Sequence, residues 1–173
     1  MRHTISISIF AILIAFTACG PQPPKAESPP STAAKTTNAA GKPSTTFELT
    51  AGDNMRFNKG LIEVPAGKEI TLTLTNIGNM PKAQMGHNLV ILDLKRKPQA
   101  FMAEASFAKE TDYIPAGMDD WMIAHTELLG PGESDTITFT APKIPGDYEF
   151  LCSFTGHYAI GMKGIMRVVV EVP

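Results

Sequence analysis

Near its end the chain reads Cys152-Ser153-Phe154-Thr155-Gly156-His157-Tyr158-Ala159-Ile160-Gly161-Met162. This stretch offers a thiolate, an imidazole and a thioether as candidate ligands of a metal ion. In the segment just before it, polar and apolar residues alternate with period two, so Tyr148, Phe150 and Cys152 share one face of a strand predicted over 147–152. We therefore expect the cysteine sulfur to lie at the end of a strand, beside the aromatic core.

A second histidine, His87, lies far upstream in the sequence. Two imidazoles and one thiolate in a plane, with a long bond to a methionine sulfur, are the ligands of a blue-copper site. Sulfur ligands favour Cu(I), while imidazole binds copper well in proteins. The residue types and their spacing therefore predict one type 1 copper ion, bound by His87, Cys152, His157 and Met162.

The 152–162 stretch resembles the C-terminal copper loop of the cupredoxin family, and of its azurin-like and auracyanin-like members in particular. Four other motifs carry the same resemblance: Met85-Gly86-His87-Asn88, Ile123-Ala124-His125-Thr126, Ser134-Asp135-Thr136-Ile137-Thr138-Phe139 and Met162-Lys163-Gly164. The resemblance covers residues 47–172 and implies a blue-copper electron carrier. It also implies a weak contact between copper and the Gly86 carbonyl, and a hydrogen-bonding role for Asn88 beside the thiolate.

The resemblance departs from azurin at one point. Azurin has three residues between the loop histidine and the methionine, whereas this chain has four, 158–161. In this respect the loop is similar to those of auracyanin and plastocyanin, so azurin's axial geometry is not carried over to Met162.

The pattern after residue 46 predicts an all-β domain over 47–173. Short alternating or apolar segments, separated by Gly- and Pro-containing turns, favour a Greek-key β-sandwich. The predicted strands are 47–50, 55–57, 61–64, 69–76, 87–92, 122–129, 135–140, 147–152 and 165–172. One segment, 98–110, is rich in Ala, Met, Phe and Glu and predicts a short helical insertion between strands.

The first 46 residues predict a leader followed by a linker. A basic start and an apolar run shorter than the ~20 residues of a membrane span make 1–18 typical of a secretory signal. The sequence Phe16-Thr17-Ala18-Cys19 resembles a lipobox, so we expect a lipid on Cys19. Residues 19–46 are rich in Pro, Ala and Thr and predict a flexible tether. The alternatives are an ordinary signal peptide with an incidental cysteine, and a spacer of no special length.

The charge balance and the number of histidines argue against two classes of function, nucleic-acid binding and copper-dependent catalysis. The chain has 15 Lys+Arg against 17 Asp+Glu, and this acidic balance argues against nucleic acid as a partner. A copper enzyme would need further histidines for a catalytic metal, but the chain has only four. We therefore expect no catalytic residues and no enzymatic activity. A copper chaperone or storage protein is the alternative to an electron carrier, although such proteins usually carry exposed arrays of Met and His.

The expected partners are redox proteins, either cytochromes or membrane oxidoreductases, together with the membrane that holds the lipid. We expect the domain on the extracytoplasmic side, either in the periplasm or at the cell surface. Electrons are expected to pass through His157, whose ring edge lies near solvent in this fold. The residues predicted to form an apolar docking patch around it are Met85, Met118, Phe154, Tyr158 and Ile160.

Overall fold

The computed structural model describes residues 43–170. The predicted signal peptide, Cys19 and most of the predicted 19–46 linker lie outside these residues. The strands within them are β1 (Thr46–Ala51), β2 (Leu61–Pro65), β3 (Glu69–Asn76), β4 (Val90–Leu92), β5 (Met122–His125), β6 (Ser134–Thr140), β7 (Gly146–Leu151) and β8 (Lys163–Val169). The helices are α1 (Lys82–Met85), α2 (Pro98–Ala105) and the short 3-10 helices η1 (Lys109–Thr111) and η2 (Asp119–Trp121).

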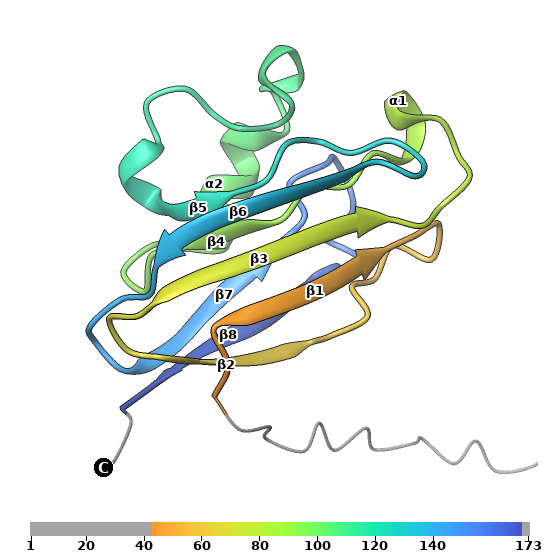
Figure 1. Cartoon of the computed structure of the whole chain (residues 1–173). Helices are drawn as coiled ribbons and strands as arrows, with labels where there is room; N and C mark the ends of the chain where they lie inside the picture. Colours follow the sequence, from red (N-terminus) through yellow and green to blue (C-terminus); the bar gives the residue numbers. More distant parts are fainter. Residues whose placement is uncertain (1–42, 171–173) are drawn as a thin grey trace, which may run out of the picture. The chain divides into compact units, whose positions relative to one another are not determined.

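The strands form two sheets that pack face to face, as Figure 1 shows. One sheet has the strand order β1-β3-β6 and the other the order β2-β8-β7-β4-β5. Strand β1 is parallel to β3, and β2 is parallel to β8, while the other pairs are antiparallel. The predicted all-β sandwich is confirmed.

Strand β3 shows most clearly how the sequence builds the sandwich. Ile70, Leu72 and Leu74 are fully buried, whereas the threonines between them are only partly buried. Period-two alternation places these two sets on opposite faces of the strand. On the outer face, the hydroxyls of Thr73 and Thr136 lie 2.8 Å apart and link β3 to β6. The hydrophobic effect therefore sets which face of β3 points inward, and the hydroxyl pair adds to the register.

Strand β4 is buried on both faces because the segment between β4 and β5 covers its outer side. Val90 and Leu92 pack there against Phe101 and Ala105 of α2, in a cluster separate from the main core. Ile91 points the other way, into the core between the sheets. Figure 1 shows α2 beside β4 and β5. The continuous apolar run of β4 is thus the pattern expected of a strand covered on both sides.

The structure corrects several predicted boundaries. Segment 55–57 is not a strand, because Met55 has a positive φ and Phe57 makes only an isolated bridge with Ala51. The strand predicted over 87–92 begins only at Val90, and the one over 122–129 ends at His125. Both lose residues because the 126–129 segment pairs locally with 87–89 instead of continuing the sheet.

The predicted 98–110 helix ends at Ala105. The hydroxyl of Ser106 donates to the Ala103 carbonyl (2.8 Å), and such a side-chain bond competes with continuation of a helix. The sequence pattern did not predict the short helices α1 and η2, and it placed the first two residues of η1 inside one continuous helix. No helix among the described residues is long and apolar enough to cross a bilayer.

Candidate metal centre

Two side chains near one another in the sequence, Cys152 and His157, meet a third from a distant segment, His87, at one end of the sandwich. His87 precedes β4, Cys152 follows β7 directly, and His157 lies on the loop between β7 and β8. One ligand atom from each lies within 4.8 Å of the other two. The distance from Cys152 Sγ to His157 Nδ1 is 3.5 Å. All three side chains are buried, and His157 is the only one of them with any exposed surface.

These residues fit a bound metal ion. Both ring nitrogens of His87 are buried without a hydrogen-bond partner. Buried polar atoms without a partner are unfavourable and rare, and the neutral imidazole of His87 has a nitrogen lone pair to which no donor is bonded. A thiolate and two imidazoles are a soft, nitrogen-and-sulfur donor set that suits copper. The unpartnered ring of His87 is therefore explained if one of its nitrogens binds copper.

Burial also controls the protonation of the three groups. It lowers the pKa of His87 and lowers that of His157 to about 4, with the neighbouring His87 adding to the second effect. It raises the pKa of the Cys152 thiol to about 12, although the backbone amides of Asn88 and Phe154 act in the opposite direction. Without metal at neutral pH, both imidazoles are therefore neutral and the thiol is protonated. A metal ion finds two free lone pairs and must displace one proton, from sulfur.

Backbone hydrogen bonds close the loop that carries the ligands. The N–H of Cys152 donates to the carbonyl of Met162 (3.1 Å), and the N–H of Met162 donates to the carbonyl of His157 (2.9 Å). A third bond runs from the His157 N–H to the Phe154 carbonyl (3.1 Å). Gly161 has φ +96°, a conformation that glycine adopts without strain. The loop thus holds Cys152 and His157 at a set spacing before a metal binds.

Asn88 links the two ligand-bearing segments. Its side-chain oxygen accepts from the backbone N–H of Ser153 (2.9 Å), and its amide nitrogen donates to the Ser153 hydroxyl (2.8 Å). The same nitrogen donates to the carbonyl of Asp112 (3.2 Å) in the segment after η1. Because Asn88 follows His87 and Ser153 follows Cys152, these bonds fix the two ligands relative to each other.

Gly86 is required by close packing. A Cβ at this position would lie 2.7 Å from the Lys82 carbonyl oxygen and 3.0 Å from the Leu128 side chain. Contacts this short would force the backbone before His87 to move. The carbonyl of Gly86 stays a predicted metal contact. The sulfur of Met162 also stays a predicted metal contact. The Met162 side chain is fully buried in the same core as Cys152.

The five residues of the predicted docking patch differ widely in exposure. Phe154 is only 8% exposed, because its ring packs between those of His157 and Tyr113, with centroid distances of 4.6 and 4.8 Å. Met118 and Tyr158 are partly buried against the α2 cluster. Met85 is also partly buried, and Ile160, at 46%, is the most exposed of the predicted patch.

Sequence reasoning missed three residues that hold the site. Tyr113 packs on Phe154, and Leu129 pairs with the backbone of His87. Asn76 is buried at the end of β3 and bonds to Leu129. Of these, only Asn76 had a signal in the sequence, since it is a polar residue on the face of β3 that otherwise carries Ile and Leu.

Comparison with known proteins agrees with this geometry. A family model described as copper binding proteins of the plastocyanin/azurin family matches residues 44–170. Azurin from Alcaligenes faecalis is 37% identical over 123 residues, which are 69% of this chain and 94% of azurin. Outer membrane protein H.8 from Neisseria gonorrhoeae is 42% identical over 132 residues, which are 75% of this chain and 69% of that protein.

A solved structure also resembles this one. Dithionite-reduced auracyanin from the photosynthetic bacterium Roseiflexus castenholzii superposes with a TM-score of 0.67 and is 42% identical in sequence. The match covers 74% of this chain and 99% of the auracyanin chain.

Proposed function

The chain belongs to the plastocyanin/azurin family of copper-binding proteins, and on this premise we propose that it is a membrane-tethered, extracytoplasmic electron carrier. It is a copper electron-transfer protein with a type 1 site. The observation that carries the proposal is the buried group of His87, Cys152 and His157, with one thiolate and two imidazoles within 4.8 Å of one another. Copper bound there would supply a reversible one-electron change between Cu(I) and Cu(II).

The protein's own residues keep the ligands still and exclude water. Cys152 and His87 are fully buried, and the bonds of Asn88 and of the 152–162 loop restrain them from several sides. Ligands that cannot move keep the same geometry in both oxidation states. A small rearrangement on electron transfer makes exchange fast, which is what a carrier needs.

The same burial favours a carrier over a copper chaperone. A protein that hands copper on must bring its donors to a partner's ligands, and Cys152 and His87 have no exposed surface for this. Opening the site would also break the bond between Cys152 N–H and the Met162 carbonyl. We assign no enzymatic activity and no catalytic residue to the chain.

The tether is proposed from the sequence and from one relative. Cys19, in its lipobox-like context, is the expected lipid attachment point, and 19–46 is the expected linker. The relative from Neisseria gonorrhoeae is named as an outer membrane protein. Together these support a lipid-anchored domain on the periplasmic or cell-surface face of a membrane.

Metabolic labelling with palmitate tests the tether. In a lipoprotein-processing bacterial host we expect the full chain to incorporate the label and to sediment with membranes. The Cys19→Ala variant should lose the label and appear in the soluble extracytoplasmic fraction, because the thiol that carries the lipid is gone. Label retained by Cys19→Ala, or equal membrane association of both proteins, would show that this cysteine is not the anchor.

Partners are proposed to be redox proteins, either cytochromes or membrane oxidoreductases, that dock on the surface near His157. Transient redox complexes bury small interfaces, which lets them separate quickly. Ile160, three residues after His157 on the same loop, offers exposed apolar surface at this end of the sandwich.

A charge at Ile160 is expected to slow electron exchange. In Ile160→Lys, two molecules that meet through this surface bring like charges together, and we expect electron self-exchange to fall about 10-fold at low salt. The visible spectrum should not change, because the exposed side chain is not a ligand. NMR line broadening of mixed Cu(I) and Cu(II) protein measures the exchange rate.

The matched control is Ile144→Lys. Ile144 is 60% exposed and precedes β7, at the end of that strand opposite to Cys152. We expect its self-exchange rate to stay within about 2-fold of the wild type. If both variants, or neither, slow the exchange, electrons do not pass through the surface at Ile160.

A further inference from the structure

Asn76 is a polar residue on the buried face of β3. It continues the alternation of Ile70, Leu72 and Leu74, and it is almost completely buried. A buried side-chain amide is unfavourable unless both its oxygen and its nitrogen are hydrogen-bonded. The bonds that Asn76 makes therefore indicate what it does at this position.

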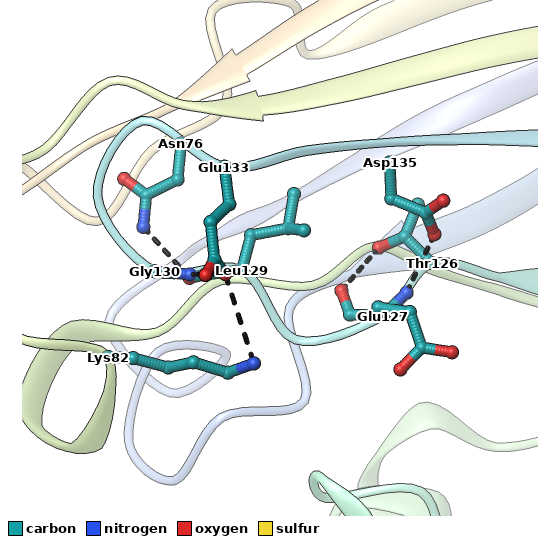
Figure 2. Close-up of polar contacts among 8 residues, drawn as sticks. All are labelled: Asn76, Lys82, Thr126, Glu127, Leu129, Gly130, Glu133 and Asp135. Atoms are coloured by element: carbon teal, nitrogen blue, oxygen red, sulfur yellow. Dashed lines mark hydrogen bonds and ion pairs between the residues drawn. The ribbon is translucent and has the colours of Figure 1, made fainter.

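Those bonds join the end of β3 to the 129–133 segment, as Figure 2 shows in part. The amide nitrogen of Asn76 donates to the carbonyl of Leu129 (2.9 Å), and its side-chain oxygen accepts from the N–H of Gly78 (2.8 Å). Its backbone N–H donates to the Glu133 carbonyl (2.9 Å), and its own carbonyl accepts from the Gly132 N–H (2.8 Å). Both the side chain and the backbone of Asn76 thus hold this segment against the sandwich.

Leu129 is the partner that connects Asn76 to the metal centre. Its carbonyl accepts a second bond, from the backbone N–H of His87 (3.0 Å), and its N–H donates to the carbonyl of His87 (2.8 Å). A carbonyl oxygen has two lone pairs, so Asn76 and His87 together fill it. Because the ring nitrogens of His87 have no hydrogen-bond partner, this backbone pair with Leu129 restrains the residue.

We propose that Asn76 is a positioning residue for the metal ligand His87, acting through the shared carbonyl of Leu129. Without the amide of Asn76, one lone pair of the buried Leu129 carbonyl is left without a donor, and β3 holds the 129–133 segment only through the backbone bonds to Gly132 and Glu133. Leu129 can then shift, and the His87 backbone shifts with it. The inference rests on the proposed copper site for its consequence, but the hydrogen bonds themselves are tested without metal.

The other side of the segment is held more weakly. The carboxylate of Glu133 accepts from the Gly130 N–H (2.7 Å) and lies 3.9 Å from the Lys82 ammonium, as Figure 2 shows. Both charged side chains are about half exposed, and exposed ion pairs of this kind contribute little to stability. Asn76 is the buried attachment, and for this reason it, rather than Glu133, is expected to control His87.

Two variants separate the roles of the amide. Asn76→Leu keeps the branching and the number of side-chain heavy atoms and removes both side-chain bonds. Asn76→Asp keeps an acceptor for Gly78 and replaces the donor to Leu129 with a carboxylate oxygen, which when ionised cannot donate. The matched control is Tyr148→Phe, which also removes one side-chain bond to a carbonyl, from Tyr148 to Ile144 (2.9 Å), at the opposite end of β7 from Cys152.

The first measurement is amide hydrogen exchange in the metal-free protein. In both Asn76 variants we expect the amides of His87 and Leu129 to exchange at least about 10-fold faster than in wild type, beyond any change at Leu72 in the centre of β3. In Tyr148→Phe these two amides should change no more than Leu72 does. A uniform change over all amides in the Asn76 variants would mean a general loss of stability and would overturn the proposal.

The second measurement is copper affinity by competition with a chelator. We expect a loss of about 10- to 100-fold in both Asn76 variants, the range found when groups that orient a metal ligand are removed, and less than about 2-fold in Tyr148→Phe. If the His87 amide exchanges faster but copper affinity is unchanged, Asn76 does not position the ligand and the proposal is overturned, while the copper site itself stands or falls with the Cys152→Ser result. In the wild type, NMR couplings across the bonds from Asn76 and His87 to the Leu129 carbonyl test the shared acceptor directly. Their absence would overturn the inference whether or not the variants fold.

Discussion

Replacing Cys152 with serine is expected to abolish the intense visible absorption of the oxidised, copper-loaded protein. Such a band arises when an electron moves from a thiolate to Cu(II), and a serine hydroxyl is neither ionised at neutral pH nor a soft donor. The absorbance of the visible band should fall more than about 10-fold relative to the wild type. Electron self-exchange should fall at least as much, because the sulfur that favours Cu(I) is gone.

The chain supplies its own control for this experiment. Cys19 is the other of its two cysteines, and Cys19→Ser should leave the colour unchanged. Met162→Leu should keep the colour and alter it only moderately, since the predicted bond from the methionine sulfur is the weak one. An intense band surviving in Cys152→Ser, or lost in Cys19→Ser, would show that the thiolate at 152 is not the copper ligand.

Replacing Phe150 with alanine is expected to cause the largest loss of stability among single changes in the core. The ring is completely buried and packs edge-on against Phe57, with centroids 5.4 Å apart. It also lies over Gly164, where a Cβ would come within 2.3 Å of it. Phe→Ala changes in close-packed cores lower the free energy of unfolding by about 3–5 kcal/mol, through lost burial and the cavity that remains. Urea denaturation of the metal-free protein measures this.

The matched control for Phe150 is Phe107→Ala. Phe107 is 90% exposed, so its truncation removes the same atoms without opening a cavity. We expect the free energy of unfolding to change by less than about 0.5 kcal/mol. Because Phe150 is two residues before Cys152 in the same core, Phe150→Ala should also weaken copper binding. Similar stability losses in the two variants would mean that the core is not packed around Phe150.

The strands that depend on local pattern could be predicted from the sequence, and those that depend on distant partners could not. The predicted bounds of β3 agree with the structure because its alternation of Ile70, Leu72 and Leu74 with threonines is unbroken. The region around His87 is also apolar, yet the N–H of Leu89 donates to the Thr126 hydroxyl (3.0 Å) instead of to a neighbouring strand. Nothing in the residues near 87 indicates that partner.

In the metal centre, the ligands could be predicted from the sequence but the residues that support them could not. The spacing of Cys152, His157 and Met162 and the motif around His87 were enough to predict which residues meet, and the structure brings His87, Cys152 and His157 together. The residues that support them come from tertiary contacts. Asn76 acts through Leu129, which is 53 residues away in the sequence. The alternation in β3 therefore marks Asn76 as an unusual polar residue on a buried face, but it does not indicate which group Asn76 bonds to.

The burial of Phe154 has the same kind of origin. An aromatic residue two positions after Cys152 is a reasonable candidate for an exposed rim. In the structure the ring of Tyr113 covers it, and Tyr113 is held in place with a positive φ of 64°. That conformation is uncommon for a residue other than glycine and is not predictable from the local sequence.

The most direct test is the optical and electron paramagnetic resonance spectrum of the copper-loaded protein after oxidation with ferricyanide. We expect an intense visible thiolate-to-Cu(II) band, a Cu(II) signal with narrow hyperfine splitting, and reversible bleaching by one electron per copper. A protein that binds copper but stays colourless, or one that bleaches irreversibly, would contradict a type 1 electron-transfer site at His87, Cys152 and His157.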